Sequence, residues 1–155
     1  MNTNTITLKQ QINIDFTDAY KNKDNVIKSA LSFLKAKIIE AEKNNKNIEL
    51  NDSEVLKVIL SSIKQRKDSI KQFNDANRLD LVEKEQLELD VLSRYLPKQM
   101  DIVELKEKAI ETINSIVIDP NNKNKNVGIV MGQLNKKYSG MFNMDDLKTL
   151  LNELL

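Results

Sequence analysis

The spacing of hydrophobic residues along the chain predicts an all-α protein. Apolar side chains recur at three- and four-residue steps almost throughout, and only 3 Gly and 2 Pro interrupt them. Steps of that size place apolar side chains on one face of a helix, and no segment shows the alternation typical of a strand. We expect helices over about 5–21, from Asp24 to about Asn44, and over about 52–76, 81–95, 102–117, 127–138 and 144–154.

Capping residues sharpen several of these boundaries. Asn51, Asp101 and Asn143 are each followed three residues later by an acidic residue and flanked by apolar ones. This pattern is typical of a capping box with a hydrophobic staple, which satisfies free amide groups at a helix start. Asp80 with Glu83 is a weaker version of the same pattern. We therefore expect helices to begin just after positions 51, 101 and 143, and a further one after Asp80.

Pro97 divides the chain into two expected subdomains. A proline stops the helix that precedes it, and the segment around it separates a long first half from a shorter second half. We expect an N-terminal bundle of about four helices over 1–97 and a three-helix bundle over 98–155. Within the second half, the Asn- and Lys-rich stretch 119–126 is expected to be a mobile polar loop.

The composition excludes most enzyme chemistry. The chain has no Cys, no His and no Trp, so it lacks thiol nucleophiles, Ser-His-Asp triads, and thiolate or imidazole metal ligands. Gly128 and Gly132 do not form a phosphate-binding loop, because no strand precedes them and the third glycine is missing. We expect no catalytic residue, metal or cofactor.

Charge and hydropathy place few limits on partners. The 24 basic and 23 acidic residues nearly cancel, so an electrostatic partner has to be inferred from local surfaces. No run approaches 18 apolar residues, and the start Met1-Asn2-Thr3-Asn4-Thr5 lacks the basic and apolar regions of a signal peptide. We expect a cytoplasmic protein that binds no membrane.

One such local surface lies on the long helix expected over 52–76. Lys57, Lys64 and Lys71 follow one another at seven-residue steps, Lys67 lies beside them, and Arg78 is next in register if the helix continues. A row of cations of this kind can follow the phosphates of a nucleic acid, and each contact releases counterions. The alternative is an ordinary solvated helix face in a lysine-rich chain.

Arg66 differs from these lysines, because it falls within the apolar arc of the same helix, between Ile59 and Phe73. A guanidinium in that position needs an acceptor. Candidate acceptors on the next helix are Glu85, Glu88 and Asp90. We expect a structural ion pair that fixes the register of the two helices.

A second candidate surface lies in the C-terminal half. Gly128 and Gly132 are one turn apart in an expected helix, where each glycine costs about 1 kcal/mol relative to alanine. Such a pair indicates close approach by a neighbouring helix or by a nucleic-acid backbone. Lys136 and Lys137 add positive charge at the same end of the helix.

Residues 64–97 carry a longer pattern of typed positions. It comprises Lys64-Gln65-Arg66-Lys67-Asp68-Ser69, Phe73, Ala76-Asn77-Arg78, Leu81, Glu85, Glu88, Leu92 and Tyr95-Leu96-Pro97, and continues through Val127-Gly128-Ile129-Val130-Met131-Gly132 and Gly140. This pattern resembles the signature of the YqeY family, which is similar to the C-terminal tail domain of GatB. GatB is the B subunit of the glutamyl/aspartyl-tRNA amidotransferase.

The resemblance implies a bipartite helical module that recognises tRNA while chemistry occurs elsewhere. Expected partners are tRNA and the amidotransferase subunits or an aminoacyl-tRNA synthetase; DNA is not expected. The family label of carbon-nitrogen ligase with glutamine as amido-N-donor would need a glutaminase cysteine or an amidase loop, and this chain has neither. An alternative is a protein-protein adaptor whose apolar groove in the second half receives a partner.

Overall fold

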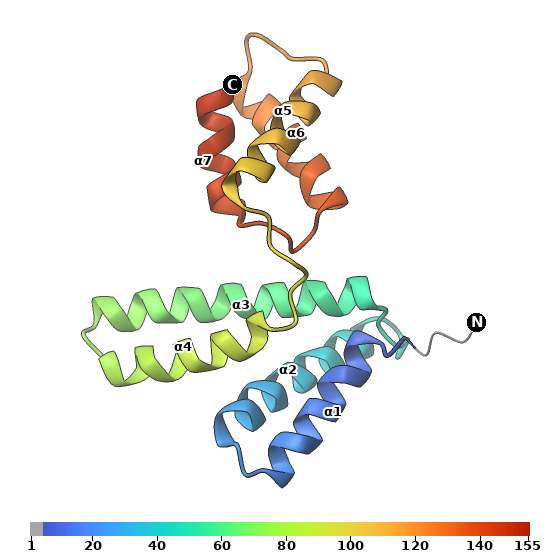
Figure 1. Cartoon of the computed structure of the whole chain (residues 1–155), viewed down its shortest axis with the longest axis vertical. Coiled ribbons are helices and arrows are strands. Elements are labelled where there is room, and N and C mark those ends of the chain that lie inside the picture. Colours follow the sequence, from blue (N-terminus) through green and yellow to red (C-terminus); the bar gives the residue numbers. More distant parts are fainter. Residues whose placement is uncertain (1–4) are drawn as a thin grey trace. The chain divides into compact units, whose positions relative to one another are not determined.

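The computed structural model describes residues 5–155 and confirms the all-α fold. Within this range there are seven helices and no strand (Figure 1). They are α1 (Leu8–Lys21), α2 (Asn25–Asn44), α3 (Asp52–Asp75), α4 (Leu79–Ser93), α5 (Ile102–Ser115), α6 (Lys123–Lys137) and α7 (Met144–Leu154). The expectation that the chain starts without a signal peptide was based mainly on residues 1–4, which lie outside the described residues. None of the described helices is long and apolar enough to cross a membrane.

The chain forms two compact units, which we call unit 1 (residues 1–95) and unit 2 (residues 96–155). Unit 1 contains α1 to α4, and unit 2 contains α5 to α7. The expected boundary at Pro97 stays a prediction.

Side-chain caps explain where most helices begin. The N–H of Glu54 donates to the Asn51 side chain at 2.9 Å, and the Glu54 carboxylate accepts from the Asn51 N–H at 2.9 Å. Asp101 and Asn143 also accept from the first turns of their helices. The predicted starts of α3, α5 and α7 are therefore confirmed. The sequence analysis missed a second reciprocal box, in which Thr7 and Gln10 cap α1.

The expected start of α4 was wrong. This helix begins at Leu79, and its N-cap Arg78 makes no side-chain cap hydrogen bond. Asp80 lies inside the first turn, where both of its carboxylate oxygens accept from the Arg78 guanidinium at 3.1 and 3.2 Å. A carboxylate is favourable anywhere in the first turn of a helix, so an acidic residue at this place does not fix the capping position.

The polar loop expected over 119–126 is also shorter than predicted. Helix α6 begins at Lys123, because the Asn122 side chain accepts from the Lys125 N–H at 3.0 Å. Asn126 is buried, accepts from the Asp119 N–H at 3.0 Å and donates to the Asp119 carbonyl at 2.7 Å. From its polar composition this segment was predicted to be a loop, although it contains a capped helix start and a buried side-chain amide.

Each unit has its own apolar core. In unit 1, α3 packs along α4, α1 packs along α2, and α2 contacts both α3 and α4 (Figure 1). Its fully buried side chains include Ile12, Leu31, Leu34, Val55, Ile59 and Leu92. In unit 2, the core is formed by Leu105, Ala109, Val127, Val130, Leu134, Leu147, Leu150 and Leu151. The outer faces of the helices are therefore the surfaces on which a binding site is sought.

Candidate functional site

Four lysines form an exposed row along α3. Lys57, Lys64, Lys67 and Lys71 are all exposed, whereas Val55, Ile59 and Ile63 on the same helix are buried. Among residues 5–155, no carboxylate lies within 4.0 Å of any of the four ammonium groups. Because a helix rises 1.5 Å per residue, the row extends over about 21 Å. We call these four residues the α3 lysine row.

Arg78 does not belong to this row. Helix α3 ends at Asp75, and the chain then turns through Asn77, which has a φ of 55°. Arg78 would be in register with the lysines only if the helix continued, and it does not. The hydrogen bond to Asp80 raises the pKa of Arg78, and the same bond lowers the pKa of Asp80. The guanidinium already has a partner, unlike the lysines of the row.

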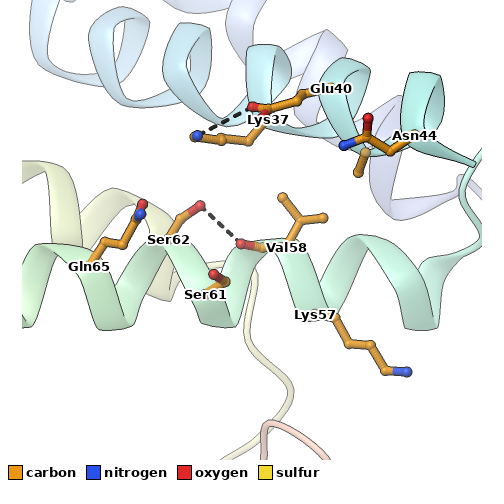
Figure 2. A pocket seen from close by; sticks show the side chains of 9 residues that line it. Lys37, Glu40, Asn44, Lys57, Val58, Ser61, Ser62 and Gln65 are labelled. Atoms are coloured by element: carbon orange, nitrogen blue, oxygen red, sulfur yellow. Dashed lines mark hydrogen bonds and ion pairs between the residues drawn. The ribbon is translucent and has the colours of Figure 1, made fainter.

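A cleft of about 320 Å³ between α2 and α3 lies beside one end of the row. Figure 2 shows Val58 and Ser62 directed into this cleft, while Lys57 at its edge is directed away from it. The Ser62 hydroxyl donates to the Val58 carbonyl at 2.9 Å, and Lys37 pairs with Glu40 at 3.3 Å (Figure 2). Lys37, Glu40 and Ser62 are thus engaged within the cleft, and the Lys57 side chain is exposed outside it.

Arg66 lies between α3 and α4, where it is only 7% exposed. Its Nη1 donates to Glu85 Oε2 at 3.0 Å and also to Glu88 Oε2. Asp90, the third acceptor considered from the sequence, is exposed and accepts instead from Gln86 at 2.9 Å. The structure brings Arg66, Glu85 and Glu88 together and leaves Asp90 apart.

Helix α2 completes the surroundings of this ion pair. The Ser29 hydroxyl donates to Glu88 Oε1 at 2.8 Å, and the Arg66 guanidinium lies over the Phe33 ring, 4.9 Å from its centroid. Neither contact was foreseen, because Ser29 and Phe33 look like ordinary members of an amphipathic helix. Together these groups fix α2, α3 and α4 relative to one another. Their arrangement is that of a structural centre.

Gly128 and Gly132 lie on an open face of α6. A Cβ built on either glycine has no neighbouring atom within 4 Å. The expectation that a neighbouring helix packs here was therefore wrong for the described chain, and the alternative of a partner outside it stays a prediction. At 100° per residue, Lys136 shares this face, whereas Lys137 lies on another side of the helix.

Lys137 lies at a cavity between α5 and α6 that the sequence analysis missed. Its Nζ is 5.3 Å from the centroid of the Tyr138 ring, and the Nζ of Lys108 is 6.0 Å from the same centroid. The cavity has a volume of about 520 Å³. Lys108 and Tyr138 are on different helices, so no spacing within one helix could have indicated their proximity. Within residues 5–155, no group of His, Cys, Asp and Glu side chains could hold a metal ion.

Comparisons with known proteins give consistent matches over most of the chain. The family model described as Yqey-like protein matches residues 9–155. An uncharacterized protein of Schizosaccharomyces pombe is 37% identical over 52% of this chain and 65% of its own length. Two fungal proteins named altered inheritance of mitochondria protein 41, mitochondrial, are also similar. That of Pyrenophora tritici-repentis is 32% identical over 84% of this chain and 70% of its own, and that of Clavispora lusitaniae is 31% identical over 83% and 74%.

Proposed function

The chain belongs to the family of Yqey-like proteins, and on that premise we propose that it is a helical module that binds tRNA through the RNA backbone. In this role it assists a tRNA-dependent amidotransferase by recognition, and the carbon-nitrogen ligase chemistry takes place in other proteins. Residues 64–97 resemble the YqeY signature, and the similarity of that family to the GatB tail supports the choice of tRNA. RNA helices are recognised mainly by shape and by phosphate and 2′-hydroxyl contacts, which demand cations more than base-specific side chains.

The observation that carries this proposal is the α3 lysine row. Four ammonium groups without carboxylate partners occupy one exposed face of a helix whose other face is buried. Asp68 and Asp75 are exposed on the same side of α3, but neither carboxylate lies within 4.0 Å of an ammonium group of the row. The unpaired ammonium groups of this row are therefore available to displace counterions from RNA.

The test is binding of the full chain to deacylated tRNA from low to physiological salt. We expect saturable binding that weakens with salt, and a Lys64→Gln/Lys71→Gln variant whose log-log salt slope is shallower by about 1.4 to 1.8, the value for two lost phosphate contacts. A Lys23→Gln/Lys46→Gln variant is the matched control, because it removes the same charge from two exposed turn positions of unit 1. Equal affinity and slope for the wild type and the row variant would exclude this role of the row.

A second candidate function, a protein-protein adaptor, is favoured by the outer side of α5. Val103 is 64% exposed, Ile110 is 40% exposed and Val117, just beyond the helix, is 93% exposed. Val103 and Ile110 are seven residues apart within α5 and so share one side of the helix, as in surfaces that receive a partner helix. A partner recovered from nuclease-treated extract by the wild type, and lost with Val103→Ser/Ile110→Ser, would support the adaptor. Recovery of RNA alone would count against it.

The proposed location is the cytoplasm. The names of the Pyrenophora and Clavispora relatives assign those proteins to mitochondria. Fractionation of cells that express the chain tests the proposal, and co-purification with mitochondria would overturn it.

A further inference from the structure

The cavity between α5 and α6 has the features of an anion site. It is lined by Lys108, Thr112 and Ser115 from α5 and by Lys136, Lys137 and Tyr138 from the end of α6 and its cap, among others. Its volume of about 520 Å³ falls within the range of small-ligand pockets. Three of the lining side chains are lysines and one, Glu111, is acidic, so the cavity has a net positive charge.

The Tyr138 ring holds two of these ammonium groups in place. The Nζ atoms of Lys108 and Lys137 lie 6.0 and 5.3 Å from the ring centroid, within the range of cation-π attraction. The ring itself is anchored, because Tyr138 is half-buried against the unit 2 core and its N–H donates to the Leu134 carbonyl at 2.8 Å. Cations from two helices are therefore positioned before any ligand arrives, which lowers the entropy cost of binding.

The remaining charges indicate the valence of the ligand. Lys108 pairs with Glu111 at 3.5 Å, and the attraction of that carboxylate raises the pKa of Lys108, which stays protonated. Among residues 5–155, Lys136 and Lys137 have no carboxylate within 4.0 Å. Once Glu111 offsets one lysine, about two positive charges remain uncompensated. A phosphodiester carries one negative charge, whereas a phosphomonoester carries about 1.5 to 2 at pH 7.

The charged donors of the cavity suit a phosphate. The Thr112 hydroxyl donates to the Lys108 carbonyl at 2.8 Å, and the Ser115 hydroxyl donates to the Thr112 carbonyl at 2.7 Å. The hydroxyl protons of Thr112 and Ser115 are thus committed; Gln133 and Tyr138 also line the cavity, and its charged donors are the ammonium groups. Such donors suit an ion whose oxygens are all acceptors.

We propose that the α5/α6 cavity of unit 2 binds a terminal phosphate, that is, a phosphomonoester dianion, held by Lys108, Lys136 and Lys137. The source that fits the proposed function is the 5′-phosphate of an RNA, and to that extent the inference rests on the proposed function. A small phosphorylated metabolite would present the same group. The site is separate from the α3 lysine row, which lies in unit 1.

The first test compares two RNAs of identical sequence, one with a 5′-phosphate and one with a 5′-hydroxyl, for binding to the full chain. We expect the phosphorylated RNA to bind about three- to tenfold more tightly, the range for gaining two partly exposed ion contacts. The preference should disappear in a Lys108→Gln/Lys137→Gln variant. It should persist in the control Lys106→Gln/Lys148→Gln, which neutralises two exposed lysines of the same unit.

A second measurement makes the result independent of RNA binding. Inorganic phosphate is titrated into the labelled protein, and amide chemical shifts are followed for residues 108–115 and 133–138. Shift changes confined to these segments, and absent in the Lys108→Gln/Lys137→Gln variant, support the phosphate site even if neither RNA binds. In that case the tRNA proposal fails and a small phosphomonoester is the remaining source.

Two outcomes would overturn the inference. The first is equal affinity for both RNAs and no phosphate-induced shifts, with salt-sensitive tRNA binding intact, which leaves the α3 lysine row in place and removes the terminal-phosphate site. The second is the absence of phosphate-induced shifts together with the absence of RNA binding. A Tyr138→Leu variant adds an internal check: its loss of the ring should weaken phosphate binding although every lysine is retained.

Discussion

The Tyr95 hydroxyl donates a hydrogen bond to Asp15 Oδ2 at 2.5 Å, although 80 residues separate the two along the chain. Gln11 donates to the other oxygen of the same carboxylate at 2.8 Å. Tyr95 is the last residue of unit 1, and Asp15 is in the middle of α1. The bond therefore attaches the end of unit 1 to its first helix.

Removal of this hydroxyl should destabilise unit 1. In a Tyr95→Phe variant Asp15 keeps only its bond from Gln11, so we expect the free energy of unfolding to fall by about 1 to 2 kcal/mol, as for other hydrogen bonds to charged groups. Urea denaturation at neutral pH measures the change. Tyr20→Phe is the control, because Tyr20 is 62% exposed and its variant should stay within about 0.5 kcal/mol of the wild type.

The same contact predicts a loss of stability in alkali. Burial, and then the hydrogen bond to Asp15, raise the pKa of Tyr95 above its ordinary value of 10.0. Above that pH the unfolded chain releases the phenol proton while the folded chain retains it, so the free energy of unfolding falls as pH rises. The fall should be shallower in Tyr95→Phe. Parallel curves for the two proteins above pH 10 would contradict this assignment.

Glu42 should contribute in the acid range. It accepts from the Lys9 ammonium at 2.8 and 3.0 Å and from the Leu50 N–H at 3.0 Å. These bonds, that of Lys9 foremost, lower the pKa of Glu42 below its ordinary value of 4.5. The stabilisation is complete above that value and is lost as pH falls through the lowered pKa, because the unfolded chain binds the proton first.

A Glu42→Gln variant measures that contribution. We expect it to be about 1 kcal/mol less stable than the wild type at pH 7, with the difference shrinking below pH 4. Glu40→Gln provides the comparison, since Glu40 forms only an exposed pair with Lys37. A difference between wild type and Glu42→Gln that stays constant down to pH 2 would rule out the titration.

The buried pair of Arg66 and Glu88 should respond asymmetrically to mutation. A Glu88→Leu variant leaves the Arg66 guanidinium short of an acceptor in a buried position, and we expect a loss of about 3 to 5 kcal/mol. The double variant Arg66→Met/Glu88→Leu removes both charges, so it should recover most of that loss. Denaturation of the single and double variants gives the coupling energy. Additive losses would show that the two side chains act independently.

The glycines of α6 allow stability and binding to be separated. Because a Cβ at Gly128 or Gly132 meets no atom of the chain, each Gly→Ala variant should be stabilised by about 0.5 to 1 kcal/mol, the difference in helix propensity. If an RNA backbone approaches this face, the same methyl groups should weaken RNA binding. More stable variants with unchanged RNA affinity would show that the face does not contact RNA.

The sequence predicted the parts of this fold that depend on local interactions. Hydrophobic spacing identified every helix, and Asn51, Asp101 and Asn143 marked three starts because a cap acts within one turn of its helix. An incorrect helix start was also a local matter. Asp80 is of a residue type that often caps helices, but here it pairs with Arg78 instead. Composition alone could not distinguish a capping carboxylate from one two residues further along, inside the first turn.

The candidate sites were predictable only where one helix carries them. The α3 lysine row follows from periodicity within α3, and the polar character of Arg66 in an apolar arc signalled a partner on another helix. The identity of that partner depends on how α3 and α4 pack. This packing brings Glu85 and Glu88 to Arg66 and leaves Asp90 in solvent. The α5/α6 cavity depends entirely on tertiary packing, so Lys108 and Tyr138 gave no signal in the sequence.

Asn126 gives one position of this asparagine-rich chain a particular chemical vulnerability. Of the asparagines among residues 5–155, it is the one with a buried side chain, and its amide both donates to and accepts from the backbone of Asp119. Deamidation would replace the donating NH₂ with a carboxylate oxygen facing the Asp119 carbonyl, and that charge would lie in a buried place. Deamidation at Asn126 would therefore open the turn that starts α6.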